Sequence, residues 1–401
     1  MGRFVRETAE DVKIHDKSKV YSGYTLFAPC FANFVWLIDM NGNVCHYWEM
    51  EHIPGLHGII LPTGNLMYLG RGPGAYEELG GCASELIEVD WEGNEVWRYD
   101  DTRLNHDFVY LENGNIVVLR FEDIPDEIQK RIKGGLPGTE LNGKRLGVQV
   151  REITRKKETV WEWNNWEHFN VEKDTECPLA FRMVYGYTNS VDVFQNGDVL
   201  LSVRHMNKVI RISKKTGDIV WEWGQDNLLG HQHDASVLKN GNILIFDNGI
   251  HRIPKKPEHS KEMSFLESSR AVEVNPDTNE IVWEFKDPTN LIYTHIAGGA
   301  QRLPNGNTLI CESRTGTLYE ITANKEVVWK YVSPFMCQRP NIWGWSKTKL
   351  IFVAHRYSRD FEGFKKKDLD PGKYEWIIRR KAQETIDMEE KIKSRLAKAG
   401  Y

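Results

Sequence analysis

The chain has 401 residues, a formal net charge of −5 at pH 7, 11% aromatic residues and 14 Trp. This charge gives no overall basic field, so the sequence argues against binding to nucleic acid or to a membrane surface. The length allows two or three ordinary domains or one large repeat architecture, and the aromatic content favours β-structure.

The N-terminal 20 residues are charged and contain no apolar stretch, so we expect an N-terminal extension (1–20) without a signal peptide. The six cysteines show no CxxC spacing, which argues against a metal knuckle or a disulfide framework. Reduced thiols and the absence of a leader predict a cytoplasmic protein, or a periplasmic one if a leader has been removed.

Two hairpin patterns alternate along the chain. The first is an apolar strand, a polar turn and a strand that ends in Trp; its six copies are 37–50, 86–100, 150–164, 209–224, 271–286 and 318–332. The second is a hairpin around an "NGN" or "TGN" turn, where Asn and Gly tolerate positive φ; its copies are 57–70, 106–120, 189–204, 233–249, 298–314 and a degraded one at 341–356.

Two hairpins make one four-stranded sheet, so six repeats predict an all-β fold, a six-bladed β-propeller over 21–362. The first Trp hairpin precedes every "NGN" hairpin, and the last "NGN" hairpin has no Trp hairpin after it. We therefore expect N-terminal strands to pair with the last blade and close the ring. The alternatives, a β-sandwich or two separate β domains, do not explain six interleaved copies.

Three long connections and a C-terminal extension depart from the repeat. Segments 121–148 and 250–270 interrupt blades, and 165–188 joins two blades; long loops on a rigid scaffold often carry function. In the extension 363–401, residues 373–398 are rich in helix formers and charge, which predicts a helix and a candidate surface for a homo-oligomer.

Polar residues recur where the inner strand of each blade is expected to begin, so they should converge at one mouth of the central channel. They are His57, His106, Asn189, His233 and Asn341, with His295 nearby. An arginine follows the second strand of each hairpin, namely Arg71, Arg120, Arg204, Arg252, Arg314 and Arg356, the last next to His355. Arg and His together predict a pocket for a small anionic or aromatic substrate. We interpret His205, His231 and His251 as loop residues outside this pocket.

Other motifs are weak. The glycines of "GRGPGAYEELGG" (70–81) lack the Lys-Ser/Thr of a phosphate loop, and no dinucleotide fingerprint is present. The residues alone leave three functions open: group transfer, a metal-dependent lyase or hydrolase, and a non-catalytic binding propeller.

Four segments carry a family resemblance. "GHQHDASVLKNGNILIFDNG", "SVDVFQNGDVLLSVRHMNKVIRISKKTGDIVWEWG", "GGAQRLPNGNTLICES" and "VAHRYSRDFEG" resemble the arylsulfotransferase family of bacterial β-propellers, over roughly 20–362. The resemblance implies sulfuryl transfer from an aryl sulfate to a phenol through a sulfohistidine, without nucleotide donor, cofactor or metal.

The resemblance also implies residue roles. It makes His295 the candidate sulfated nucleophile, and it matches His233 and Arg252 by motif and His106 by blade position as further catalytic residues. Substrate-binding candidates are His57, Asn189, Arg204, Arg314, Asn341 and His355.

Overall fold

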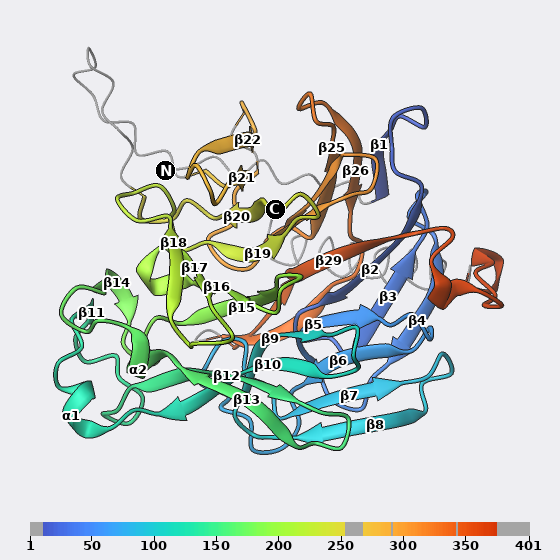
Figure 1. Ribbon diagram of the computed structural model, residues 1–401. Coiled ribbons are helices and arrows are strands. Elements are labelled where there is room, and N and C mark those ends of the chain that lie inside the picture. The colour runs from blue at the N-terminus through green and yellow to red at the C-terminus, as the bar shows by residue number, and fades with distance from the viewer. Residues whose placement is uncertain (1–10, 253–267, 290–291, 342–343, 375–401) are drawn as a thin grey trace, which may run out of the picture.

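The computed structural model describes residues 11–252, 268–289, 292–341 and 344–374. Six β-sheets of four or five strands follow one another around a ring, which is the predicted six-bladed β-propeller (Figure 1). In the described part of the chain, no helix is long and apolar enough to cross a membrane.

Blades one to five each contain an "NGN" hairpin followed by a Trp hairpin, as predicted. Blade one consists of β5 (Pro54–Ile60), β6 (Leu66–Gly70), β7 (Glu85–Val89) and β8 (Glu95–Asp100). Blade two consists of β9 (Leu104–Tyr110), β10 (Ile116–Asp123), β12 (Leu146–Ile153) and β13 (Thr159–Asn164). Blade three consists of β15 (Thr188–Val193), β16 (Val199–Val203), β17 (Lys208–Ile212) and β18 (Ile219–Trp223).

Blades four and five follow the same order. Blade four consists of β19 (His233–Val237), β20 (Ile243–Asp247), β21 (Arg270–Val274) and β22 (Ile281–Lys286). Blade five consists of β23 (Gly299–Arg302), β24 (Thr308–Glu312), β25 (Thr317–Ile321) and β26 (Val327–Val332). A fifth strand, β1 (Asp11–His15), pairs with β26 at the outer edge, so part of the predicted N-terminal extension belongs to the sheet.

Blade six closes the ring with strands from both ends of the chain, as predicted. The number of strands that each end contributes differs from the prediction. Its order is β29 (Ile351–Ser358), β2 (Gly23–Pro29), β3 (Phe34–Ile38) and β4 (Val44–Glu49). The predicted hairpin 341–356 is wrong: β27 (Cys337–Asn341) and β28 (Gly344–Thr348) form a separate hairpin, and only β29 enters the blade. The segment 341–356 lacks an Asn-Gly turn, and β2 supplies the missing second strand.

The repeated Trp residues connect neighbouring blades. One indole N–H per blade donates to a backbone carbonyl of the next blade: Trp48 to Asp90, Trp97 to Arg155, Trp163 to Gly217, Trp223 to Asn279, Trp283 to Ala323 and Trp329 to Met40. The series runs completely around the ring. It explains why a large aromatic residue with a donor recurs in every copy.

A second series of bonds joins the inner strands β5, β9, β15, β19, β23 and β29, which lie side by side around the axis. Here an inner side chain accepts a backbone N–H from the next blade: Asp107 from Val191, Ser190 from Ala235, Asp192 from Val237, Asp234 from Ala300 and Gln301 from Arg356. Several polar residues of the inner strands are therefore part of the scaffold.

Two of the predicted insertions pair with each other outside the ring. The first carries α1 (Asp126–Gln129) and β11 (Gly134–Leu136); the second begins with α2 (Asn165–His168) and carries β14 (Glu176–Phe181), which runs parallel to β11. Short 3-10 turns are η1 (Arg204–Met206), η2 (Glu362–Phe364) and η3 (Pro371–Tyr374). The predicted helix at 373–398 lies, after residue 374, outside the described residues, as does most of 250–270.

Candidate functional site

A cavity of about 740 Å³ lies at the end of the ring where the inner strands begin. Five of the residues predicted from the sequence line it: His106, His233, His295, Arg204 and Arg314. Arg71 from the wider arginine series lines it too, with the two acidic residues Glu77 and Glu78. Its aromatic lining consists of Phe31, Phe181, Tyr187 and Phe352. The cavity therefore combines cations, imidazoles and apolar rings.

One ring nitrogen of His106 forms a hydrogen bond, and the other has no partner among the described residues. Nδ1 lies 3.2 Å from Asn105 Oδ1, while Nε2 has no hydrogen bond among the described residues. The residue occupies a β-bulge of β9 and has φ 45°, an arrangement that redirects a side chain at the end of a strand. Burial, together with the charges of Arg204 and His205, lowers the pKa of His106 to about 3. At neutral pH His106 is an uncharged imidazole, the form that can act as a nucleophile.

Gly81 makes room for this ring. Its φ is +74°, and a Cβ at this position would lie 2.4 Å from three atoms of the His106 imidazole. The Gly81 carbonyl also accepts the His106 backbone N–H at 2.7 Å. The glycine-rich segment 70–81 therefore contributes to the site by close packing, although it is no phosphate loop.

Arg204 lines the cavity without a carboxylate partner among the described residues. It opens η1, directly after β16, and burial lowers its pKa, although the guanidinium stays charged at neutral pH. An arginine in such a place lacks the counter-ion that a partly buried cation requires. The arrangement suits an anionic ligand with oxygens that match the planar fork.

Tyr187 was missed by the sequence interpretation, and the placement of His205 outside the pocket was wrong, since both residues line the cavity. The Tyr187 ring stacks on His205 with centroids 4.7 Å apart, and it meets His106 edge-on at 5.2 Å. Its hydroxyl donates to the Gly80 carbonyl at 2.8 Å, and burial raises its pKa to about 12. No repeat signal marks Tyr187, because it precedes the position at which the histidines recur.

His233 lines the cavity, but both of its ring nitrogens are engaged. Nδ1 lies 2.7 Å from Asn248 Oδ1, and Nε2 accepts the backbone N–H of Ala297 at 3.2 Å. The Asn248 amide in turn donates to the carbonyls of Thr294 and Ala297. His233 thus fixes the turn that presents His295, which is exposed at the cavity rim.

Three predicted arginines do not reach the cavity, and the placement of Arg252 there is corrected. Arg252 is paired with Asp247 and donates to the Ser268 carbonyl at 3.2 Å. A nearby carboxylate holds the other two as well: Asp101 holds Arg120, and Glu320 lies 3.1 Å from Arg356. Arg204, which lines the cavity, forms no ion pair with a carboxylate among the described residues.

His57 and His355 form a partly buried pair along the channel, and neither lines this cavity. Their Nε2 atoms are 2.9 Å apart, and His57 Nδ1 bonds Asp107. Burial opposes protonation of His57, but the Asp107 carboxylate outweighs it and raises the pKa of His57. Asn189 is also buried, with its amide donating to the Gln232 carbonyl at 2.9 Å. These three predicted substrate ligands do not line the cavity, and the side chain of Asn341 lies outside the described residues.

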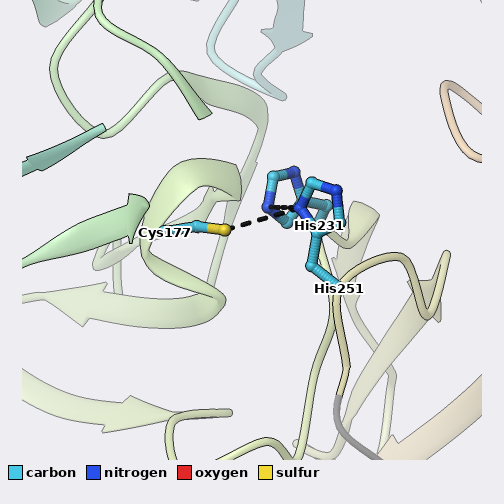
Figure 2. A group of neighbouring side chains, drawn as sticks. All are labelled: Cys177, His231 and His251. Carbon is cyan, nitrogen blue, oxygen red and sulfur yellow. Dashed lines mark hydrogen bonds between the residues drawn. The ribbon is translucent and has the colours of Figure 1, made fainter. Parts of the chain in front are cut away.

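A second group of reactive side chains lies just outside the cavity. Cys177 of β14, His231 before β19 and His251 after β20 point toward one another (Figure 2). His251 Nδ1 lies 3.5 Å from Cys177 Sγ and 3.4 Å from His231 Nε2. Both histidines lie outside the cavity, as interpreted from the sequence, but they face a cysteine on the insertion between blades two and three, which no sequence pattern indicated. Cys30, Cys45, Cys82, Cys177 and Cys311 are free thiols.

Solved structures similar to this chain are distant in sequence. A protein of unknown function from Bacteroides caccae is 13% identical with a TM-score of 0.53, covering 84% of this chain and 100% of its own. A streptogramin B lyase is 12% identical with a TM-score of 0.46, covering 87% and 94%. A catalytically inactive virginiamycin B lyase from Staphylococcus aureus with quinupristin is 12% identical with a TM-score of 0.44, covering 80% and 88%. The first supports the fold alone.

No curated protein sequence matches the chain. The model of one protein family does match, that of the arylsulfotransferases (ASST), over residues 59–334. This range is more than half of the 401 residues and includes all of blades one to five except β1 and most of β5. The chain belongs to the arylsulfotransferase family.

Proposed function

We propose that this protein transfers a sulfuryl group from an aryl sulfate ester to a phenol, without a nucleotide donor and through a sulfohistidine. The observation that carries the proposal is the pairing of uncharged His106 with Arg204, a cation that has no carboxylate partner among the described residues, in one cavity. Membership of the arylsulfotransferase family supports the same reaction.

The cavity offers a place for each part of an aryl sulfate. Phe31, Phe181 and Phe352 form apolar walls for the aryl ring. Arg204 is the ligand for the sulfuryl oxygens, since its fork matches two oxygens of a tetrahedral anion. Arg314 stands at the exposed rim, where it attracts the anionic donor.

His106 is the better candidate for the nucleophile than His295 on grounds of orientation. The bond from Nδ1 to Asn105 Oδ1 fixes the ring and leaves the Nε2 lone pair for attack. His295 is exposed at the rim, in contact with both solvent and cavity, which suits a group that exchanges the proton of a phenol.

In the first half-reaction, the Nε2 lone pair of His106 forms a bond to sulfur while the bond from sulfur to the aryl oxygen breaks. The phenolate leaves with the electron pair and takes a proton from His295 or from water. In the second half, the acceptor phenol gives its proton to His295 and its oxygen attacks sulfur. The N–S bond then breaks, and His106 returns to its uncharged form. Arg204 stabilises the charge that spreads over the sulfuryl oxygens in both steps.

The test is the release of p-nitrophenol from p-nitrophenyl sulfate, followed with and without phenol. Turnover that requires phenol, with parallel lines in double-reciprocal plots, is the expected result. Arg204→Gln should lower kcat/KM by about 10²–10³. Arg211→Gln is the control, because Arg211 pairs with Asp198 at 2.7 Å outside the cavity. No phenol-dependent release, or equal rates for Arg204→Gln and wild type, would contradict the proposal.

A further inference from the structure

We propose that Cys177, His231 and His251 form a zinc site that joins the insertion carrying β14 to blade four. None of the three residues lines the cavity, so this site is separate from the proposed sulfuryl transfer and does not depend on it. Figure 2 shows the thiol on one side and the two imidazoles on the other, with dashed lines from the thiol and from His231 to a ring nitrogen of His251.

The spacing of the three ligand atoms fits tetrahedral zinc. All three lie within 4.8 Å of one another, with separations of 3.5 Å for Cys177 Sγ to His251 Nδ1 and 3.4 Å for His251 Nδ1 to His231 Nε2. Zinc bonds of about 2.0–2.3 Å at tetrahedral angles place ligand atoms about 3.3–3.8 Å apart. The ion therefore fits between these atoms after small side-chain movements.

The two contacts within the group compete for one atom, Nδ1 of His251. His251 Nδ1 faces both the thiol and the His231 ring nitrogen, but a ring nitrogen has either one lone pair or one proton. It can therefore serve only one of its two neighbours. A cation accepts a lone pair from all three atoms at once, and zinc prefers this combination of thiolate and imidazole.

The backbone holds the two histidines in place before an ion binds. The Gly249 N–H donates to the Gly230 carbonyl at 2.9 Å, which ties the segment before β19 to the turn after β20. The His231 N–H donates to Asn207 Oδ1 at 2.8 Å. His231 is 2% exposed, whereas Cys177 and His251 are partly exposed, so the ion can enter from solvent. Three protein ligands leave the fourth position to water.

The site has a structural consequence for the cavity. Cys177 is the second residue of β14 (Glu176–Phe181), and Phe181 at the other end of this strand lines the cavity while 57% exposed. Zinc would attach β14 to blade four and stabilise this wall. We infer a structural ion, whose removal loosens the insertion while the reacting groups keep their places.

The test uses the full chain, freed of metal by a chelator and then titrated with Zn²⁺ or Co²⁺. One equivalent of Zn²⁺ should bind, and Co²⁺ should produce a thiolate-to-cobalt charge-transfer band in the near ultraviolet. Zn²⁺ should raise the Tm of the wild type. Cys177→Ser should lose the band, and His251→Gln should weaken binding at least about tenfold. His168→Gln is the control, since His168 is exposed and stacks on Trp163.

Two results would overturn the proposal: no thiolate band in the folded wild type, or equal Zn²⁺ affinity in the wild type and Cys177→Ser. If Cys177→Ser fails to fold, His251→Gln and the wild-type cobalt spectrum still decide the question, because His251 is partly exposed. Stoichiometric Cu⁺ in place of Zn²⁺ would contradict the zinc assignment. A zinc-binding protein without phenol-dependent turnover would contradict only the proposed sulfuryl transfer.

Discussion

His233 and Asn248 are joined through Nδ1 and Oδ1 at 2.7 Å, and both side chains are buried beneath the turn that carries His295. The same asparagine donates to the Thr294 and Ala297 carbonyls, and the His233 Nε2 accepts the Ala297 N–H. His233, the motif histidine of blade four, therefore supports the cavity rim.

The first prediction concerns this support. His233→Ala and Asn248→Ala should each lower the free energy of unfolding by about 1–3 kcal/mol, because each leaves buried polar groups without a partner. The double variant should cost less than the sum by at least about 1 kcal/mol, since the two residues share one network. Urea unfolding measures all three. Single costs that add within about 0.5 kcal/mol would show that the residues act independently.

The second prediction concerns Gly81 and uses Gly93 as its matched control. Both have positive φ, +74° and +89°, but a Cβ at Gly81 would lie 2.4 Å from the His106 ring, whereas none lies within 4 Å at Gly93. Gly93→Ala should cost about 1 kcal/mol of stability and leave the phenol-dependent rate unchanged. Gly81→Ala should displace His106 and reduce kcat by about 10²-fold or more. Equal rates for the two variants would show that the position of the His106 ring does not affect the reaction.

The third prediction concerns the Trp residues that link the blades. Trp329 is fully buried and donates to the Met40 carbonyl at 2.9 Å, whereas Trp283 is partly exposed and donates to Ala323 at 3.0 Å. An arginine stacks over each ring, so the two sites differ mainly in burial. Trp329→Phe should lower the free energy of unfolding by about 2 kcal/mol or more, and Trp283→Phe by less than about 1 kcal/mol. Similar losses would argue against burial as the cause.

The fourth prediction concerns Asp234 and pH. Burial, with the nearby Asp107 carboxylate, raises the pKa of Asp234 to about 7 in the folded protein. The unfolded chain releases this proton near pH 4, so the folded state binds more protons between about pH 4 and 7, and stability falls as pH rises through this window. In Asp234→Asn the carboxyl group is absent, and the amide oxygen can still accept the Ala300 N–H.

The variant should therefore gain stability relative to wild type as pH rises from about 4 to 7, by at most about 4 kcal/mol. Urea unfolding over this pH range measures the difference. Asp198→Asn is the control, because the pKa of Asp198 is shifted in the opposite direction. Its side-chain bonds to Asn196 and Arg211 outweigh the effect of burial and lower this pKa. A difference between Asp234→Asn and wild type that does not change with pH would contradict the raised pKa.

The parts of the fold that depend on short-range signals could be predicted from the sequence. The "NGN" turns and Trp hairpins lie within about 15 residues, so their pairing in blades one to five followed directly from the repeat. The pairing of β2 with β29 joins Leu26 to His355, and no local turn marks it. The sequence therefore could not show which strands make up blade six.

The candidate site could likewise be predicted only where a local sequence signal marks its residues. The repeat register places His106 and His233 at the cavity, but it does not tell which ring nitrogens are free. Arg252 follows its strand as Arg204 does, but Asp247, five residues before it, pairs with its guanidinium, a contact that the sequence interpretation did not weigh. Cys177 lies 74 residues from His251, on an insertion outside the repeat, so no spacing rule connects them.

The measurement that tests the central claim most directly is the location of the covalent intermediate. Wild type is mixed with p-nitrophenyl sulfate without acceptor, quenched at high pH and mapped by peptide mass spectrometry, with His106→Ala and His295→Ala alongside. The account predicts one SO₃ group on the peptide that contains His106, present in wild type and His295→Ala and absent in His106→Ala. An adduct on His295, or none on any histidine, would contradict it.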